Sequence, residues 1–291
     1  MHNREWDSVS GHLEGVRAEG NEIIVGEHRL RVTSEREPGK IPWADAGVDV
    51  VIESTGRFTD RAGAAAHLDA GAKKAVISAP ASEDVPAVVL GVNDDSIDWA
   101  EPIVSNGSCT TNCLAPMAKV LHDNFGIVSG LMTTVHAYTA DQRLHDSPHR
   151  DMRRARAAAL STIPTSSGAA RTIGKIIPDL DGNLTGLALR VPVPVGSITD
   201  LTAHLDSMVT AAQVNEAFRA AAEAGPLASY VQYSDAPIVS ADIVGNSNSA
   251  IFDAPLTQVI GNQVKIFAWY DNEWGFSNRV VELASRMGRG A

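Results

Sequence analysis

One short segment of the sequence carries residue types that could perform covalent chemistry. It runs from Ser105 to Cys113 and reads SNGSCTTNC. A strand-like run ends near Ser105, and a helical spacing of apolar residues begins at Leu114. Cys109 is therefore expected in the first turn of a helix, where unpaired backbone N–H groups and the helix dipole stabilise a thiolate. Small hydroxyl side chains flank it and leave room for a substrate, so the pattern predicts a nucleophilic thiol.

The residues alone also allow other uses for the two cysteines. Free cysteines are most often buried small hydrophobes, which is the expectation for Cys113, one helical turn beyond Cys109. A Cys-x-x-x-Cys redox pair is a second alternative, although dithiol motifs have a shorter spacing. No tight histidine cluster accompanies the pair, so no metal site is expected.

A nucleophilic thiol needs a base, and His136 stands out among the nine histidines because it closes a strand-like run. A neutral imidazole can take up the thiol proton and later return it. Spacing along the sequence does not by itself bring His136 to Cys109. An ordinary hydrogen-bonded histidine remains the alternative.

Residues 47–105 alternate between short apolar runs and a helical stretch, which predicts a parallel sheet covered on both faces. We expect a helix over 60–68 with Thr59 as its N-cap. The strands are expected at 48–52, 75–77, 87–90 and 102–104.

From about residue 126 the strand-like runs are longer, which predicts a mostly antiparallel sheet with helices on one side. Thr210 and Gln213 have the spacing of a capping box, so a helix should begin there and end at Gly225. The last helix is expected over 278–287. The strands are expected at 187–191, 238–244 and 263–269, with a hairpin turn at 260–262.

Composition narrows the class of protein without selecting a function. The chain has 291 residues, 44% of them hydrophobic and 20% charged, as in globular proteins of one or two domains. The net charge of −11 argues against a nucleic-acid partner, because phosphate backbones need a basic surface. No apolar run approaches the ~20 residues that span a membrane, and no signal peptide opens the sequence. Two cysteines suit a reducing cytoplasm.

The segment SNGSCTTNCLAP, residues 105–116, resembles the active-site segment of phosphorylating glyceraldehyde-3-phosphate dehydrogenases, which most often have Ala where this chain has Gly107. Five further segments match the family in order and spacing, so the resemblance runs from about Trp6 to the end. They are TTVHAYT (133–139), RRARAAA (153–159), IPTSSGAA (163–170), LRVPVPVGS (189–197) and WYDNEWGFSNR (269–279).

The resemblance implies the glycolytic oxidation of D-glyceraldehyde 3-phosphate to 1,3-bisphosphoglycerate through a thioester on Cys109, with His136 as base. Guanidinium and hydroxyl groups suit the two phosphates involved. By resemblance the substrate phosphate is bound by Thr139 and Arg190, and inorganic phosphate by Ser108, Thr110, Arg154, Ser167 and Gly168. Without the resemblance, residues 150–156 would be read as a solvated helix face and 165–168 as a helix cap.

The resemblance also implies NAD as the cofactor, with NADP as the alternative, and a homotetramer as the assembly. The residues expected to line the cofactor groove are Arg36, Thr55, Gly56, Ser78 and Asn272. Thr55 and Gly56 suit the carboxyl end of a parallel strand, where such sheets bind ligands.

The sequence departs from the family in having no G-x-G-x-x-G, the turn that binds the cofactor pyrophosphate. The expected fold is therefore α/β plus α+β: an N-terminally incomplete doubly wound, Rossmann-like sheet (1–108), a mostly antiparallel catalytic domain (109–273), and a C-terminal helix (274–291) returning to the first. We favour a start codon assigned too far downstream over a chain that is truly short. Alternative functions are an erythrose-4-phosphate dehydrogenase or an inactive truncated paralogue that acts only as an oligomer partner.

Overall fold

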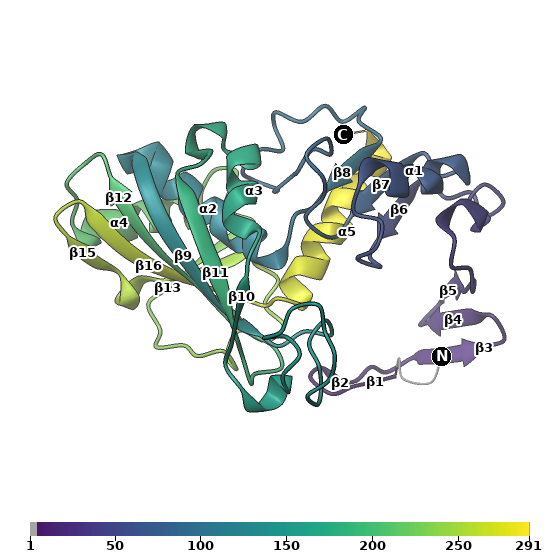
Figure 1. Cartoon of the computed structure of the whole chain (residues 1–291). Coiled ribbons are helices and arrows are strands. Elements are labelled where there is room, and N and C mark those ends of the chain that lie inside the picture. Colours follow the sequence, from purple (N-terminus) through teal and green to yellow (C-terminus); the bar gives the residue numbers. More distant parts are fainter. Residues whose placement is uncertain (1–4, 291) are drawn as a thin grey trace.

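The computed structural model describes residues 5–290, and Figure 1 shows two sheets joined by the long C-terminal helix α5 (Trp274–Arg289). The smaller of these sheets has the order β6-β7-β8, with all strands parallel. Helix α1 (Arg61–Asp69) connects its first two strands. The bounds are β6 (Val50–Glu53), β7 (Lys74–Ile77) and β8 (Ile103–Ser105).

Both faces of the β6-β7-β8 sheet are covered, as the sequence predicts. Successive side chains of a strand point to opposite faces. Accordingly, Ala75 and Ile77 of β7 cluster with Ala64 of α1. Val76, between them in the chain, clusters with Leu283 of α5. The first and the last helix of the chain therefore pack on opposite faces of one sheet.

Two local predictions for this region are wrong. The N-cap of α1 is Asp60, not Thr59, because the Asp60 carboxylate accepts the Gly63 N–H at 2.7 Å. Residues 87–90 are buried but do not form a strand, and only Ala87 bridges to β8. The Asn93 side chain bonds to the backbone of Ala87 and Val89 instead, which turns the chain away from the sheet.

The larger sheet has the order β10-β11-β9-β12-β16-β14-β13, with β15 paired to β16, and most of its pairs are antiparallel as predicted. The predicted strand at 238–244 is wrong, because this segment is a run of turns in which Asp242 accepts the Val239 N–H. The predicted hairpin turn at 260–262 is confirmed between β15 and β16. The bounds are β9 (Ile127–Ala137), β10 (Ile163–Ser166), β11 (Leu184–Val191), β12 (Ser197–Leu205), β13 (Val231–Ser234), β14 (Ala250–Asp253), β15 (Gln258–Ile260) and β16 (Gln263–Tyr270).

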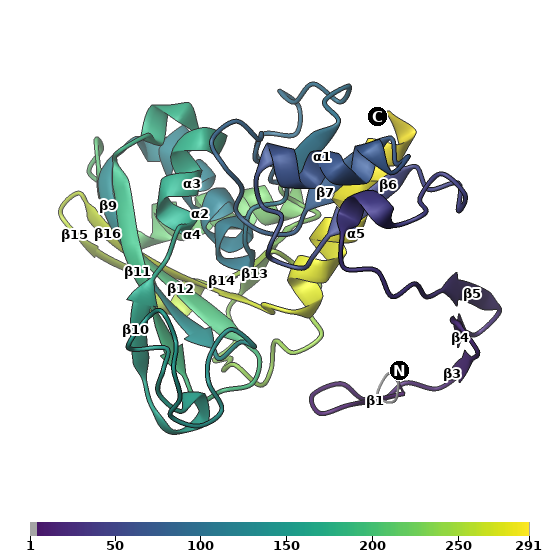
Figure 2. The same cartoon turned by 45° about the vertical axis from the view of Figure 1, so that its right-hand side comes forward.

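Helices α2 (Cys109–Phe125), α3 (Ala169–Ile176) and α4 (Ala211–Glu223) cover one face of the larger sheet (Figures 1 and 2). Their apolar side chains and the sheet form the largest hydrophobic cluster of the described residues. The capping box of Thr210 and Gln213 is present as predicted. The opposite face of the sheet stays open and exposes Leu131 and Leu187.

The N-terminal residues form short hairpins that run along one side of the molecule as an extended arm (Figure 2). A short 3-10 helix, η1 (Pro38–Lys40), leads from the arm to β6. Residues 5–290 contain three more short 3-10 helices. The arm strands are β1 (Trp6–Asp7), β2 (Gly11–His12), β3 (Val16–Glu19), β4 (Glu22–Val25) and β5 (His28–Arg31), and the other short helices are η2 (Ala158–Leu160), η3 (Pro178–Leu180) and η4 (Ala254–Leu256).

Candidate active site

Cys109 is the first residue of α2, as the sequence predicts. The chain leaves β8 at Ser105 and turns through Asn106, Gly107 and Ser108. Ser108 is the N-cap, and its hydroxyl accepts the Thr111 N–H at 3.0 Å. Gly107 has φ +65°, a left-handed conformation that glycine adopts at little cost. The turn therefore delivers the thiol to the end of the helix where backbone N–H groups are free.

Asn112 holds this turn, a role that the sequence analysis missed. Its Nδ2 donates to the carbonyl oxygens of Asn106 and Ser108 at 2.8 and 3.0 Å. An asparagine one turn inside a helix gives no sequence signal of such a clamp, because its acceptors depend on the loop geometry. Cys113, behind it, is fully buried as expected.

His136 lies beside Cys109, with Nε2 at 3.3 Å from Sγ. It sits near the end of β9, and its Nδ1 lies 2.7 Å from the carbonyl oxygen of Ala137. A carbonyl can only accept and a guanidinium can only donate, so the Nδ1–H tautomer donates to Ala137 and turns the lone pair of Nε2 toward the thiol, whereas the Nε2–H tautomer accepts from Arg190 at Nδ1. This arrangement can move a proton from sulfur to nitrogen.

Arg190 contacts the same ring from the neighbouring strand, because β11 runs parallel to β9 with Arg190 in register with His136. Its Nη1 lies 2.9 Å from His136 Nδ1 and donates to Thr139 Oγ1 at 2.9 Å. Thr139 and Arg190, predicted to share one phosphate, therefore lie together.

Burial and Arg190 set the proton affinities of the pair. Burial, and then the charge of Arg190, lower the pKa of His136 to about 4, so the ring is neutral at pH 7. Burial also raises the pKa of the Cys109 thiol, while Arg190 and the Thr110 N–H oppose that rise. Burial therefore outweighs the predicted stabilisation of a free thiolate. Arg190 favours the thiolate but disfavours the imidazolium.

The residues predicted for inorganic phosphate are less closely grouped. The Thr110 hydroxyl bonds to the buried Tyr270 hydroxyl at 2.8 Å, so it points into the protein interior. Arg154 lies in a turn rather than on a helix face, and its Nε donates to Thr165 Oγ1 at 2.8 Å. Gly168 is the N-cap of α3, and the Ser167 hydroxyl accepts the Ala169 N–H at 3.3 Å.

Asp141 connects the two predicted phosphate sites and was missed by the sequence analysis. It accepts the Thr139 hydroxyl through Oδ1 and pairs with Arg154 through Oδ2. Nothing in the spacing of a lone aspartate signals these contacts, because Arg154 is brought to it only by the fold.

The predicted cofactor residues divide into two groups. Thr55, Gly56 and Ser78 directly follow β6 and β7, at the carboxyl ends of the parallel strands. Asn272 follows β16, and its Oδ1 accepts the Gly196 N–H at 3.1 Å and the Ser197 hydroxyl at 2.9 Å. With Oδ1 held by two donors, the amide nitrogen of Asn272 is the atom left to meet a ligand.

Arg36 is not joined to these groups. It lies exposed between β5 and η1, and within residues 5–290 its side chain forms no hydrogen bond or ion pair with another predicted site residue.

Thr55 is held by Glu53, whose carboxylate accepts the Thr55 N–H at 2.7 Å and lies 2.9 Å from Nε2 of His67.

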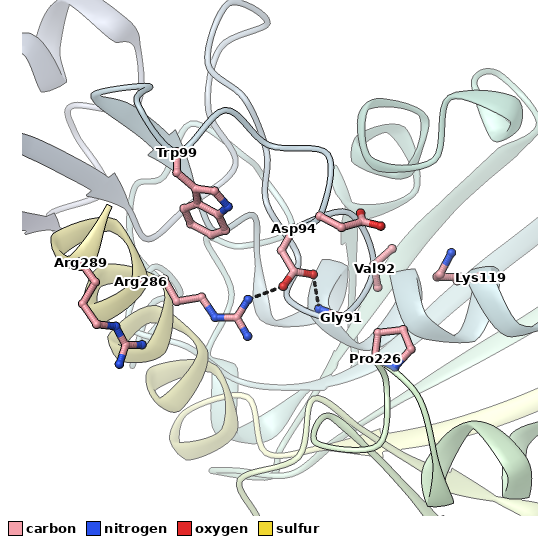
Figure 3. A pocket seen from close by; sticks show the side chains of 9 residues that line it. Gly91, Val92, Asp94, Trp99, Lys119, Pro226, Arg286 and Arg289 are labelled. Carbon is pink, nitrogen blue, oxygen red and sulfur yellow. Dashed lines mark hydrogen bonds and ion pairs between the residues drawn. The ribbon is translucent and has the colours of Figure 1, made fainter. Parts of the chain in front are cut away.

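A pocket of about 570 Å³ lies away from the thiol, between α5, α2 and the loop after residue 90 (Figure 3). Arg286 pairs there with Asp94, which also accepts the Gly91 N–H at 2.6 Å. Arg286 further donates to the Tyr230 hydroxyl at 3.0 Å. These contacts tie α5 to the loop after residue 90.

In the part of the chain that the structure describes, no helix is long and apolar enough to cross a membrane. Over the same residues, no three His, Cys, Asp or Glu side chains gather in a way that could hold a metal ion.

Two family models match the chain. The model described as glyceraldehyde 3-phosphate dehydrogenase, NAD binding domain, matches residues 1–61, and the C-terminal domain of the same family matches residues 108–272. Among curated relatives, glyceraldehyde-3-phosphate dehydrogenase of Mycolicibacterium smegmatis is 55% identical, covering 99% of this chain and 85% of the relative. That of Mycobacterium avium is 57% identical, covering 99% and 86%. Glyceraldehyde-3-phosphate dehydrogenase 2 of Streptomyces arenae is 57% identical, covering 97% and 85%.

Proposed function

The chain belongs to the glyceraldehyde-3-phosphate dehydrogenase family, and we infer that Cys109 and His136 carry the chemistry of its glycolytic reaction. The protein is an NAD-dependent, phosphorylating oxidoreductase that acts on D-glyceraldehyde 3-phosphate. The observation that supports the residue roles best is the 3.3 Å approach of Cys109 Sγ to His136 Nε2 at the start of α2.

The first step needs a proton to leave the thiol. His136 Nε2 accepts it as sulfur attacks the aldehyde carbon, and the resulting thiohemiacetal oxygen is then stabilised by the protonated ring. Moving the proton within the pair avoids building a free thiolate in a buried site, where its pKa is raised. The thiohemiacetal is then oxidised to a thioester on Cys109.

NAD, when bound, supplies the hydride acceptor for that oxidation. Asn272 would orient the nicotinamide carboxamide through its free amide nitrogen, and Thr55, Gly56 and Ser78 would line the groove at the carboxyl ends of β6 and β7. These residues fit the nicotinamide end of the cofactor. The N-terminus of α1 does not fit a pyrophosphate, because the Asp60 carboxylate already caps it. The N-terminally incomplete sheet and a contact from Arg36 stay predictions.

The acyl group leaves by phosphorolysis. A phosphate oxygen attacks the thioester carbon, the C–S bond breaks, and Cys109 departs while 1,3-bisphosphoglycerate is released. Arg190 and Thr139 would hold the phosphate of the substrate, and Arg154, Ser108, Ser167 and Gly168 would hold the attacking one. For Thr110 the structure favours its backbone N–H, since the hydroxyl is engaged by Tyr270.

The domain division at residues 109 and 274 is also part of the proposal. It is supported by the start of α2 at Cys109 and the start of α5 at Trp274.

We further propose a homotetramer in the cytoplasm. Two free cysteines suit a reducing compartment. The open face of the larger sheet, with Leu131 exposed, is the kind of surface that a second copy covers.

The test is NADH formation from D-glyceraldehyde 3-phosphate, with and without inorganic phosphate. We expect turnover that requires phosphate and is abolished in Cys109→Ser. Faster turnover of erythrose 4-phosphate would assign the alternative substrate. Rapid labelling of Cys109 by iodoacetate without NADH formation on either sugar would instead favour a non-catalytic oligomer partner.

A further inference from the structure

Asp141 places a negative charge where the proposed function requires phosphate. It follows β9 by a few residues and accepts the hydroxyl of Thr139, which is itself the acceptor for Arg190 Nη1 at 2.9 Å. Its second carboxylate oxygen pairs with Arg154 Nη1. One carboxylate therefore contacts a residue from each of the two proposed phosphate sites.

The surroundings of Asp141 favour its ionised form. Burial raises the pKa of Asp141, but the Thr139 hydroxyl and the charges of Arg154 and Arg190 outweigh that effect, so the pKa lies below its ordinary value. Like a phosphate oxygen, each carboxylate oxygen accepts from a hydroxyl or a guanidinium. Asp141 thus makes the contacts that a phosphate dianion would make with the same donors.

The neighbouring carboxylate, Asp151, does not share this position. It lies 3.5 Å from Arg154 Nε and accepts the Thr165 hydroxyl at 3.1 Å. Asp151 therefore lies near Nε of Arg154, whereas Asp141 accepts from Nη1 of the same side chain. Among the described residues, Asp141 alone forms hydrogen bonds with both Thr139 and Arg154.

We propose that Asp141 is a competing internal anion: it accepts from the hydroxyl of Thr139, pairs with Arg154, and so weakens phosphate binding at both sites. This inference rests on the proposed function for the identity of the two sites. An incoming phosphate must displace or share these donors and must bind next to a fixed negative charge. The cost keeps phosphate affinity low, which favours release of the doubly phosphorylated product.

A purely structural role for Asp141 predicts the opposite sign. If the carboxylate served only to hold Arg154 in place, its removal would loosen the guanidinium and weaken phosphate binding. If it acts as a competing anion, its removal strengthens binding. The two roles are therefore separated by the direction of one measured change.

The experiment is a calorimetric titration of inorganic phosphate into the full chain at low ionic strength, comparing wild type with Asp141→Asn. The amide keeps the shape and one acceptor oxygen but loses the charge. We expect the Kd of phosphate to fall about fivefold, the size of effect that a single partly exposed charge has on a neighbouring ion. Asp141→Ser, which also removes the charge, should shift the Kd in the same direction.

Asp146→Asn is the matched control. Asp146 lies in the same loop but pairs with Arg156 at 2.9 Å and is largely exposed, so the Kd should stay at the wild-type value. An unchanged or raised Kd in both Asp141 variants would overturn the proposal, as would the same fall in Asp146→Asn. The titration needs no turnover, so tighter phosphate binding without NADH formation would refute only the proposed function.

Discussion

Arg190 Nη1 lies 2.9 Å from His136 Nδ1, so the guanidinium expected to hold the substrate phosphate touches the expected base. The contact follows from register, since β11 and β9 run parallel with these two residues opposite each other. The charge of Arg190 acts on both members of the catalytic pair, lowering the pKa of His136 and opposing the rise of the pKa of Cys109. If the proposed roles hold, substrate binding and proton transfer are coupled through one side chain.

Arg190→Leu should make the thiol less reactive. Without the guanidinium charge the pKa of Cys109 rises further, so fewer molecules carry a thiolate at pH 7. The measurement is the rate of alkylation by iodoacetamide as a function of pH, whose midpoint should move upward. Arg190→Lys keeps the charge and should retain most of the wild-type profile; equal midpoints in the wild type and Arg190→Leu would contradict the coupling.

His136 should make the protein less stable in acid. Its pKa is lowered to about 4 in the folded chain, by burial first and by Arg190 second, against about 6.5 when unfolded. Between these values the unfolded state binds the proton and the folded state does not, so the free energy of unfolding falls as the pH falls. The loss should reach about 2 kcal/mol at pH 5 relative to pH 7. Urea unfolding at the two pH values should show this loss shrinking in His136→Asn; an identical loss in the variant would assign it to other groups.

Asn272→Asp should weaken cofactor binding without disturbing the fold. Its Oδ1 can still accept from Gly196 and Ser197, but the amide donor Nδ2 becomes a carboxylate acceptor. We expect the KM for NAD to rise about tenfold, the cost of replacing one well-placed hydrogen bond by a repulsive contact. Thermal unfolding should change little. The exposed Asn183 provides the control, since Asn183→Asp should leave the KM for NAD at its wild-type value.

Leu131→Asp should lower the oligomeric state. Leu131 is 67% exposed on the open face of the larger sheet, where a charge would have to be buried if a second copy covered it. Sedimentation velocity should then show smaller species than the wild type. Val281 is 60% exposed on α5, which packs on the β6-β7-β8 sheet, so Val281→Asp should sediment as the wild type does. A wild type that sediments as a monomer would refute the tetramer itself.

Sequence patterns located the elements that have strong local signals. The start of α2 at Cys109 is predicted from a strand end and an apolar helical spacing close by, and the structure adds Ser108 as its N-cap. The capping box at Thr210 is equally local. The strand prediction for residues 87–90 was wrong because an apolar run indicates that a segment is buried but not that it pairs with a strand. Here the Asn93 side chain forms the hydrogen bonds that a neighbouring strand would have formed.

Contacts between side chains of different elements could not be predicted from the spacing of residues along the sequence. Cys109 and His136 are brought together by β9 running past the start of α2, and the family resemblance, not the pattern, paired them. The segment 238–244 failed as a strand prediction for a similar reason. Its end is fixed by a distant residue, Asp271, which accepts the Gly245 N–H at 2.8 Å and stabilises turns.

The position of α5 has a consequence for synthesis of the chain. One face of the β6-β7-β8 sheet is completed by the last helix, and Lys74 Nζ donates to the carbonyl oxygen of Met287 across 213 residues. On the ribosome, Val76 and Val104 therefore gain their contacts with α5 only after residues 274–289 have emerged. Contacts so distant along the chain close late and slow folding, and an exposed sheet invites chaperone binding in the meantime. The β6-β7-β8 sheet can therefore complete this face only after α5 has been synthesised.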